Sequence, residues 1–408
     1  MECEVFRLDN GLRIAFHEDR SIHTIHCGFM INAGSRDETQ DEHGLAHLIE
    51  HGLFKGTEKR KAFHVLSRLD SVGGEINAYT TKEETCIYAS ALKEHFLRAA
   101  ELTMDIVFAA SFPQKELNKE VGVIKDEING YKDAPDEMLM DEFEERLFPG
   151  HALGRNILGT EKGVSNLQRD QLLNFVERMY STDEIVFACV GNISKKRFLT
   201  FCENALSKIP MRKRLNSTRG LPSTDSFDVE LKKTVHQTHT IIGGTTVGMN
   251  HDDSKSMTLL NNVLGGPALN SQLNLNIRER FGYCYYIESG YTAYSDIGLF
   301  QVYFGTDPQH QQKILKLVRK EMDKLSSGKM SDRALNASKK QLLGQIALGQ
   351  EQRSSLMISI AKSLLHFNKV DAYSQLDEKV MSITAESLRE TAEFVFAPSN
   401  MSRLAYIP

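Results

Sequence analysis

Residues 42–51 read Glu-His-Gly-Leu-Ala-His-Leu-Ile-Glu-His, and the interpretation of the whole chain depends on this stretch. In a helix, His47 and His51 are four residues apart, so both imidazoles project from one face. Glu50 precedes His51 and lies three residues after His47, within reach of a water held between the two rings. Two neutral imidazoles and a nearby carboxylate supply most of a catalytic zinc site. The spacing is His-x-x-Glu-His, the inverse of the commoner His-Glu-x-x-His.

The same residues allow two other interpretations. An ordinary amphipathic helix could carry the histidines on its solvent-exposed face. His43 and His47 are also four residues apart, but no carboxylate lies between them, and Gly44 is more typical of a helix start than of a helix interior. We therefore interpret His43 as a residue at the helix start and predict His47 and His51 as the metal ligands.

A third ligand is needed, because a catalytic zinc keeps one position open for water and takes three ligands from the protein. Residues 114–131 predict a long helix rich in acidic side chains. Glu120 and Glu127 are seven residues apart in it, two helical turns, and so they share a face. We expect one of the pair to bind the metal and the other to orient a ligand through a hydrogen bond. A solvated acidic surface is the alternative.

Four segments together resemble a known family: GSRDE at 34–38, GLAHLIEHGLFKGT at 44–57, GGEINAYTTKEET at 73–85 and LGRNILGTEKGV at 153–164. They are similar to motifs of the pitrilysin-type zinc peptidases, which include insulin-degrading enzyme and mitochondrial processing peptidase. The resemblance runs from about residue 4 to the C-terminus and is closest to the short family members. In the family the third ligand follows the second histidine by 76 residues, which implies Glu127 here, and Glu120 matches a second glutamate seven residues earlier.

The resemblance implies an α+β fold of two homologous domains, each a mainly antiparallel sheet packed with helices. Met211 to Asp228 is polar and contains Pro, Gly, Ser and Thr, which is typical of a linker. We place a zinc-binding catalytic domain at 1–214, the linker at 215–227 and a homologous metal-free domain at 228–408. In the second domain Ser256 to Leu264 falls where the zinc helix should fall, but it carries no ligands.

A strand around residues 75–79 is expected to hold the substrate. In the family this is an edge strand beside the zinc that pairs with the substrate main chain, which here implies Asn77 and Ala78. Strand addition of this kind gives affinity through backbone hydrogen bonds and little sequence preference. An interior strand with a satisfied asparagine is the alternative.

The second domain contains Ile277-Arg-Glu-Arg-Phe-Gly-Tyr-Cys-Tyr-Tyr286, which is similar to the family's Arg-Glu-Lys-Arg-Gly-Leu-x-Tyr segment. The similarity implies that Arg278 and Tyr285 hold the substrate backbone. Phe281 and Tyr283 depart from the family pattern. Tyr283 or Tyr286 could therefore be the partner of Arg278, and a packing role for the tyrosine stays open.

The predicted function is a zinc-dependent endopeptidase, with one Zn²⁺ per chain, that hydrolyses unfolded peptides in a chamber formed by two clam-shell subunits. Zinc held by the three ligands would activate water, Glu50 would take its proton and pass it to the leaving amine, and Glu120 would orient a ligand histidine. Long family members carry four domains and this chain two. The resemblance thus implies a homodimer, or a heterodimer with a related subunit, in which Arg278 and Tyr285 complete the partner's zinc site.

Three other functions fit parts of the sequence. A non-catalytic interaction subunit, like the respiratory-complex core subunits, would share the fold, but such relatives lose ligands that are present here. A presequence-processing peptidase is a second alternative, although no targeting extension or glycine-rich loop marks it. A non-peptidase zinc hydrolase fits the metal chemistry but explains neither the edge strand nor the Arg/Tyr segment.

Composition argues against several other classes of protein. The net charge is −5 and no basic run exceeds Met211-Arg-Lys-Arg214, which disfavours nucleic acid as a partner. No stretch approaches the apolar length of a membrane helix, and the N-terminus lacks the features of a secretory signal. The six cysteines show no Cys-x-x-Cys spacing and are expected to be reduced thiols. We therefore expect a cytoplasmic protein without a membrane partner.

Overall fold

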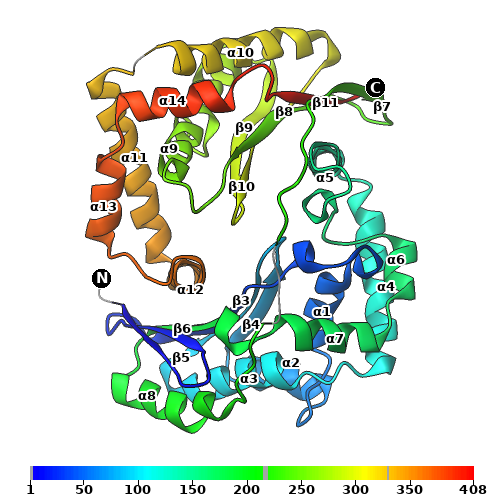
Figure 1. Cartoon of the computed structure of the whole chain (residues 1–408), viewed down its shortest axis with the longest axis vertical. Coiled ribbons are helices and arrows are strands. Elements are labelled where there is room, and N and C mark those ends of the chain that lie inside the picture. The colour runs from blue at the N-terminus through cyan, green and yellow to red at the C-terminus, as the bar shows by residue number, and fades with distance from the viewer. Residues whose placement is uncertain (1–2, 215–218, 329) are drawn as a thin grey trace. The chain divides into compact units, whose positions relative to one another are not determined.

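The computed structural model describes residues 3–214, 219–328 and 330–408. The chain is an α+β protein that divides into two compact units (Figure 1). The first unit comprises Met1–Asn129, Arg155–Arg219 and Ala347–Tyr373, and the second comprises Gly130–Gly154, Gly220–Ile346 and Ser374–Pro408. The two units therefore interleave along the sequence.

The sheet of the first unit is mixed but mainly antiparallel. Its strands are β1 (Glu4–Arg7), β2 (Arg13–Glu18), β3 (Thr24–Ile31), β4 (Glu75–Thr80), β5 (Thr85–Leu92) and β6 (Ile185–Gly191). Their order is β1-β2-β6-β3-β5-β4, and among these pairings β2 with β6 is the parallel one. Asn10-Gly11, a dipeptide typical of turns, lies between the antiparallel strands β1 and β2, and Gly11 adopts a φ of 93° that favours glycine.

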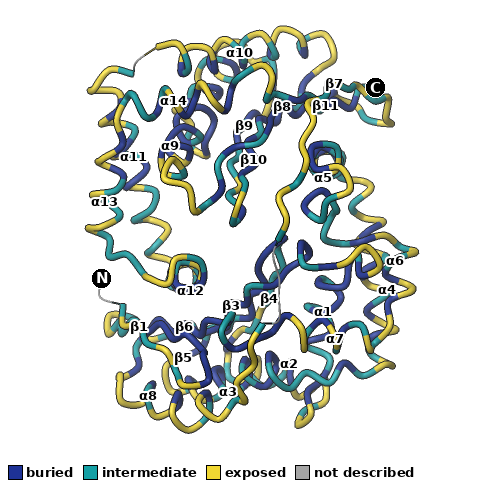
Figure 2. The backbone as a smooth tube through the Cα atoms, in the orientation of Figure 1, coloured by how far each residue is buried: buried dark blue, intermediate teal, exposed yellow. Residues whose placement is uncertain are grey.

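Helices cover both faces of this sheet. One face packs into a large apolar core with helices drawn from α1 (Leu45–Leu53), α2 (Ala62–Asp70), α3 (Phe96–Ala109), α4 (Gln114–Tyr131), α6 (Glu161–Asn166), α7 (Arg169–Met179) and α8 (Lys195–Asn204). The other face is covered by α12 (Arg353–Phe367), a helix from the C-terminal half of the chain. Leu356, Met357 and Ile360 of α12 are buried there against Met30 and Val186, and Figure 2 shows this inner side of α12 as buried.

The second unit repeats the strand topology of the first. Its strands are β7 (Asp228–Lys232), β8 (Thr238–Val247), β9 (Cys284–Ala293), β10 (Ile297–Thr306) and β11 (Ser402–Ile407), in the order β7-β11-β8-β10-β9. The β7–β11 pair is parallel and the other pairs are antiparallel, as in the series β2-β6-β3-β5-β4. Helix α9 (Ser254–Gly265) follows β8 as α1 follows β3. The predicted fold, two related domains each built on a mainly antiparallel sheet, is confirmed.

The second unit also receives a helix from the opposite half of the chain. Its helices include α9, α10 (Gln311–Ser327), α11 (Asp332–Glu351), α13 (Tyr373–Met381) and α14 (Ala385–Val395). The remaining helix, α5 (Pro135–Leu147), buries Leu139 and Phe143 against Ile241 and Leu404 on the β8 and β11 strands. A division of the chain at one linker does not account for α5 and α12, because each packs on the sheet of the other half. Residues 215–218 of the predicted linker lie outside the described residues, and 219–227 form no helix or strand.

The remaining composition-based expectations concern cysteines and the membrane. All six cysteines carry free thiols, and all except Cys3 are buried. Among the described residues, no helix combines the length and apolarity that crossing a membrane requires.

Candidate active site

Helix α1 brings the His-x-x-Glu-His stretch to the edge of the first unit's core. The helix begins after Gly44, whose φ of 91° favours glycine and whose added Cβ would lie 2.9 Å from the Leu158 carbonyl oxygen. Leu45, Leu48 and Ile49 are buried on one side of the helix. The helical period therefore leaves His47 and His51 together on the half-buried side, as the spacing predicts.

Helix α4 supplies the third candidate ligand. Ile124 and Ile128 are buried in the core and fix the orientation of this helix, so that Glu127 faces α1. One carboxylate oxygen of Glu127 lies 3.7 Å from Nε2 of His47 and 3.7 Å from Nε2 of His51. Candidate ligand atoms of the three side chains all lie within 4.8 Å of one another. The structure thus brings together the three residues expected to bind the metal.

The protonation state of His47 suits a metal ligand. Burial, and then the proximity of His51, lowers the pKa of His47 to about 4. The imidazole is therefore neutral at neutral pH, which is the form that binds metals. Two imidazole nitrogens and one carboxylate oxygen, all reachable by one ion, match the donor set of catalytic zinc sites. These residues fit a zinc ion.

Glu120 and Lys55 lie behind the ligands. Glu120 is buried on the apolar stripe of α4, and its Oε2 lies 3.1 Å from Nδ1 of His51. The other oxygen of Glu120 lies 2.8 Å from Nζ of Lys55, which follows α1. Because an acceptor at Nδ1 fixes the proton on that nitrogen, this arrangement leaves Nε2 of His51 free to face Glu127.

A cleft of about 330 Å³ opens beside this group. Glu50 lines it, and burial raises the pKa of the Glu50 carboxyl above its usual range. Asn77 and Ala78 line it from β4, which ends the strand order of the first unit's sheet, so that among the described residues β4 pairs with β5 alone. The other lining residues are Phe54, Lys55, Leu66 and Ile76 together with His51 and Glu120. An edge strand, the Glu50 carboxylate and the candidate ligand His51 therefore line one cleft.

The predicted Arg/Tyr segment belongs to the second unit. Arg278 lies in the π-helical turn η7 (Asn274–Glu279), where its guanidinium donates to Oδ1 of Asn274 at 3.1 Å. The Arg278 guanidinium carbon lies 5.8 Å from the ring centre of Tyr285, whose exposed fraction is 87 %.

The two other tyrosines have different neighbours. Tyr283 stacks on His310 with ring centres 4.6 Å apart, and it also stacks on Phe281. The hydroxyl of Tyr286 donates to Glu288. The geometry thus favours Tyr285 as the partner of Arg278, and the substrate role of this pair stays a prediction.

Two family models match consecutive parts of the chain. Residues 13–161 match the model described as insulinase (peptidase family M16), and residues 166–342 match the peptidase M16 inactive domain. The chain is 31% identical over 385 residues to the "Uncharacterized zinc protease YmxG" of Bacillus subtilis, covering 94% of this chain and 92% of that one. This chain belongs to the peptidase M16 family.

Other M16 relatives agree with this assignment. An uncharacterized zinc protease of Streptomyces coelicolor is 32% identical over 95% of this chain and 86% of its own length. Among solved structures, a peptidase M16 inactive domain from Pseudomonas fluorescens has a TM-score of 0.92 at 17% identity, covering 100% of this chain and 98% of that one. A Helicobacter pylori protease gives 0.90 at 18% identity, covering 100% and 99%. Both structures share the fold of this chain.

Two residues near the M16 site were not singled out from the sequence. Lys55 lies within the FKGT part of the quoted motif, and a positive charge one helical turn after His51 was its available signal. Glu38 is the last residue of the quoted GSRDE segment. Its carboxyl accepts hydrogen bonds from the N–H groups of Gly44 and Ala46 at the start of α1, and no spacing in the sequence indicates this contact.

Proposed function

We propose that this M16 chain is a zinc-dependent endopeptidase that hydrolyses unfolded peptides. The observation that carries the proposal is the convergence of His47, His51 and Glu127 within reach of one ion, beside the cleft that Glu50 and His51 line. The names of the relatives, zinc proteases, support the same reaction class.

We assign each residue of the site a separate role in hydrolysis. Zinc bound by the three ligands would supply Lewis acidity, which polarises a carbonyl and lowers the pKa of a water. Glu50 takes the proton of the attacking water and passes it to the leaving amine, a role suited to a carboxyl whose pKa is raised by burial. Glu120 holds the orientation of His51. The free edge of β4 at Asn77 and Ala78 pairs with an extended peptide, which requires an unfolded substrate.

The proposal extends to a homodimer. Arg278 and Tyr285 donate hydrogen bonds to substrate carbonyls, and in the homodimer they complete the zinc site of the partner subunit. Support comes from the exposure of Tyr285 and from the resemblance to longer family members with four domains.

Zinc content and peptide cleavage, measured together on wild type and on Glu50→Gln, test the proposed function. We expect about one zinc per chain in both proteins and cleavage of an unfolded reporter peptide by wild type alone, because Glu50 moves a proton and does not bind the metal. His51→Ala serves as the control that should lose zinc. Absence of zinc from wild type prepared without chelators would overturn the proposal and favour a non-catalytic interaction subunit.

A further inference from the structure

The start of helix α1 lacks a side-chain cap of its own. The N-cap position is Gly44, which has no side chain, and the first N–H groups of any helix have no partner within the helix. Glu38, six residues earlier, supplies the missing acceptors. Its Oε2 accepts from the Gly44 N–H at 3.1 Å and its Oε1 accepts from the Ala46 N–H at 2.8 Å. The Glu38 side chain is buried, so this carboxyl is held by the protein and not by solvent.

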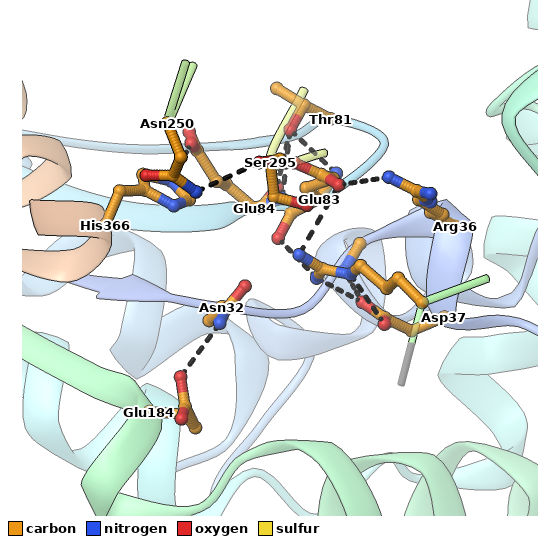
Figure 3. Close-up of polar contacts among 12 residues, drawn as sticks. Asn32, Arg36, Asp37, Thr81, Glu83, Glu84, Glu184, Asn250, Ser295 and His366 are labelled. Atoms are coloured by element: carbon orange, nitrogen blue, oxygen red, sulfur yellow. Dashed lines mark hydrogen bonds and ion pairs between the residues drawn. The ribbon is translucent and has the colours of Figure 1, made fainter. Parts of the chain in front are cut away.

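The segment that carries Glu38 is fixed to the β4–β5 turn. The backbone N–H groups of Ser35 and Arg36 donate to the carbonyls of Thr81 and Lys82. The Arg36 guanidinium pairs with Glu83 at 2.6 Å, as Figure 3 shows, and both side chains are almost fully buried. Ion pairs this deeply buried tolerate little displacement of either partner.

Asp37 fixes the same segment through a second guanidinium, that of Arg219. Its carboxylate accepts two hydrogen bonds from Arg219, at 3.0 and 2.7 Å. Ser35, Arg36 and Asp37 are thus all anchored, and Glu38 follows directly after them. The carboxyl of Glu38 is therefore presented to α1 from a rigid support.

A second segment, residues 155–164, encloses the other side of the helix start. Arg155 donates to the Glu38 carbonyl at 2.6 Å, and the side chain of His43 lies 2.9 Å from the Asn156 carbonyl oxygen. Gly44 and Gly159 approach so closely that a Cβ on Gly159 would lie 2.9 Å from the Gly44 Cα. This packing explains why the helix must begin at Gly44.

We propose that Glu38 is a positioning residue for the M16 metal site, which sets the start of α1 and thereby the placement of His47 and His51. His47 lies in the first turn of α1 and follows Ala46, whose N–H donates to Glu38. Fraying of that turn would displace one ligand and leave Glu127 on α4 in place. The inference rests on the proposed zinc site, and Glu38 touches no ligand itself.

Zinc affinity, measured by competition with a chromogenic chelator, tests the inference on full-length wild type, Glu38→Gln and Glu42→Gln. The amide of Glu38→Gln can accept one of the two N–H bonds but not both. We expect roughly tenfold weaker zinc binding, the scale of other outer-sphere changes at metal sites. Hydrogen exchange of the peptide covering residues 44–53 should accelerate in the same variant.

Glu42 is the matched control. It is also a buried glutamate of this segment and also accepts a backbone N–H, that of Thr39, but it makes no bond to α1. Glu42→Gln should keep wild-type zinc affinity.

The outcomes separate the inference from the proposed function. Equal zinc affinity in Glu38→Gln and wild type, or equal losses in both variants, would overturn the positioning role while leaving the zinc site intact. Wild type without zinc would instead remove the proposed function. If Glu38→Gln does not fold, Glu38→Asp, which keeps the carboxylate but withdraws it by one methylene, is measured against the same criterion.

Discussion

Lys55 pairs with Glu120, which in turn contacts the candidate ligand His51. Lys55→Met should leave Glu120 with His51 as its one polar partner and weaken the orientation of that ligand. We expect zinc affinity to fall by roughly threefold to tenfold. This is at or below the smallest loss of affinity usual when a group that bonds directly to a metal ligand is removed. Chelator competition measures this. Lys119→Met is the control, because Lys119 pairs with Glu116 on the exposed side of α4. An equal change in both variants would assign the effect to general charge.

The buried carboxyl of Glu38 should make the free energy of unfolding depend on pH. Burial raises its pKa to about 8 against the opposing effects of the Ala46 and Gly44 N–H bonds and of Arg155, while Glu42 raises it further. The folded state therefore keeps a proton that the unfolded chain has released. The stability contributed by this group is lost as the pH rises from about 4.5 towards about 8.

Denaturant unfolding of wild type and Glu38→Gln across this pH range measures the effect. The free energy of unfolding of wild type, minus that of the variant, should decrease with rising pH, because glutamine does not titrate. A difference that stays constant with pH would contradict the raised pKa.

At the scale of single residues, helical spacing identified His47 and His51 as candidate ligands but left Glu120 and Glu127 both open. The resemblance to the family singled out Glu127. Lys55 had a sequence signal, its position one helical turn after His51, whereas Glu38 had none, because a contact between a loop carboxyl and a helix start is created by tertiary structure and not by a repeat.

At the scale of elements, Gly52 decides how closely α1 and the start of α4 approach. A Cβ at Gly52 would lie 2.7 Å from Cδ1 of the buried Phe112 and 3.3 Å from Cδ2 of Leu117. Gly52→Ala should therefore lower the free energy of unfolding by about 1–3 kcal/mol, the usual cost of overpacking. It should also weaken zinc binding, because His51 precedes it and Glu127 belongs to α4.

Gly122→Ala provides the matched control on α4. An added Cβ there meets nothing within 4 Å, so alanine should be neutral or stabilise the helix by up to about 1 kcal/mol. Thermal unfolding and chelator competition on both variants measure the contrast. Similar behaviour of the two alanines would mean that Gly52 is not required for packing.

The identity of most elements was predictable, but their assignment to a sheet was not. Apolar side chains recur at helical spacing in α5 and, as Leu356, Met357 and Ile360, in α12. The same periodicity does not indicate on which of the two sheets the apolar face of each helix packs. The exchange of α5 and α12 between the two halves depends on the complementarity of apolar surfaces such as Phe143 against Leu404, which only the folded chain reveals.

At the scale of the whole molecule, the repeated strand order argues that the two halves have diverged in function while keeping one topology. Helix α1 of the first half carries the candidate ligands His47 and His51, whereas α9 of the second half contains no histidine and no acidic residue. What the second half retains at its surface is the Arg278 and Tyr285 pair. If Arg278 and Tyr285 of one chain complete the zinc site of another, two variants with changes in different halves should restore each other's activity.

Mixing two inactive variants tests whether the halves cooperate between subunits. Glu50→Gln removes the proposed base, and Arg278→Ala removes the proposed donor to substrate and should lower cleavage by about 10²–10³-fold. In a heterodimer of the two, one site combines an intact Glu50 with an intact Arg278 from the partner subunit. Random pairing of co-refolded chains should therefore restore about a quarter of wild-type cleavage, since half of the dimers carry one intact site of two.

The control mixture is Glu50→Gln with His51→Ala. Both changes lie in the zinc-binding half, so no pairing of these chains creates an intact site, and cleavage should stay at the level of the single variants. Recovery in the first mixture alone means that the Arg/Tyr half of one chain serves the zinc half of another. Failure of both mixtures, with dimers confirmed by mass, would mean that Arg278 acts within its own chain or does not contact substrate.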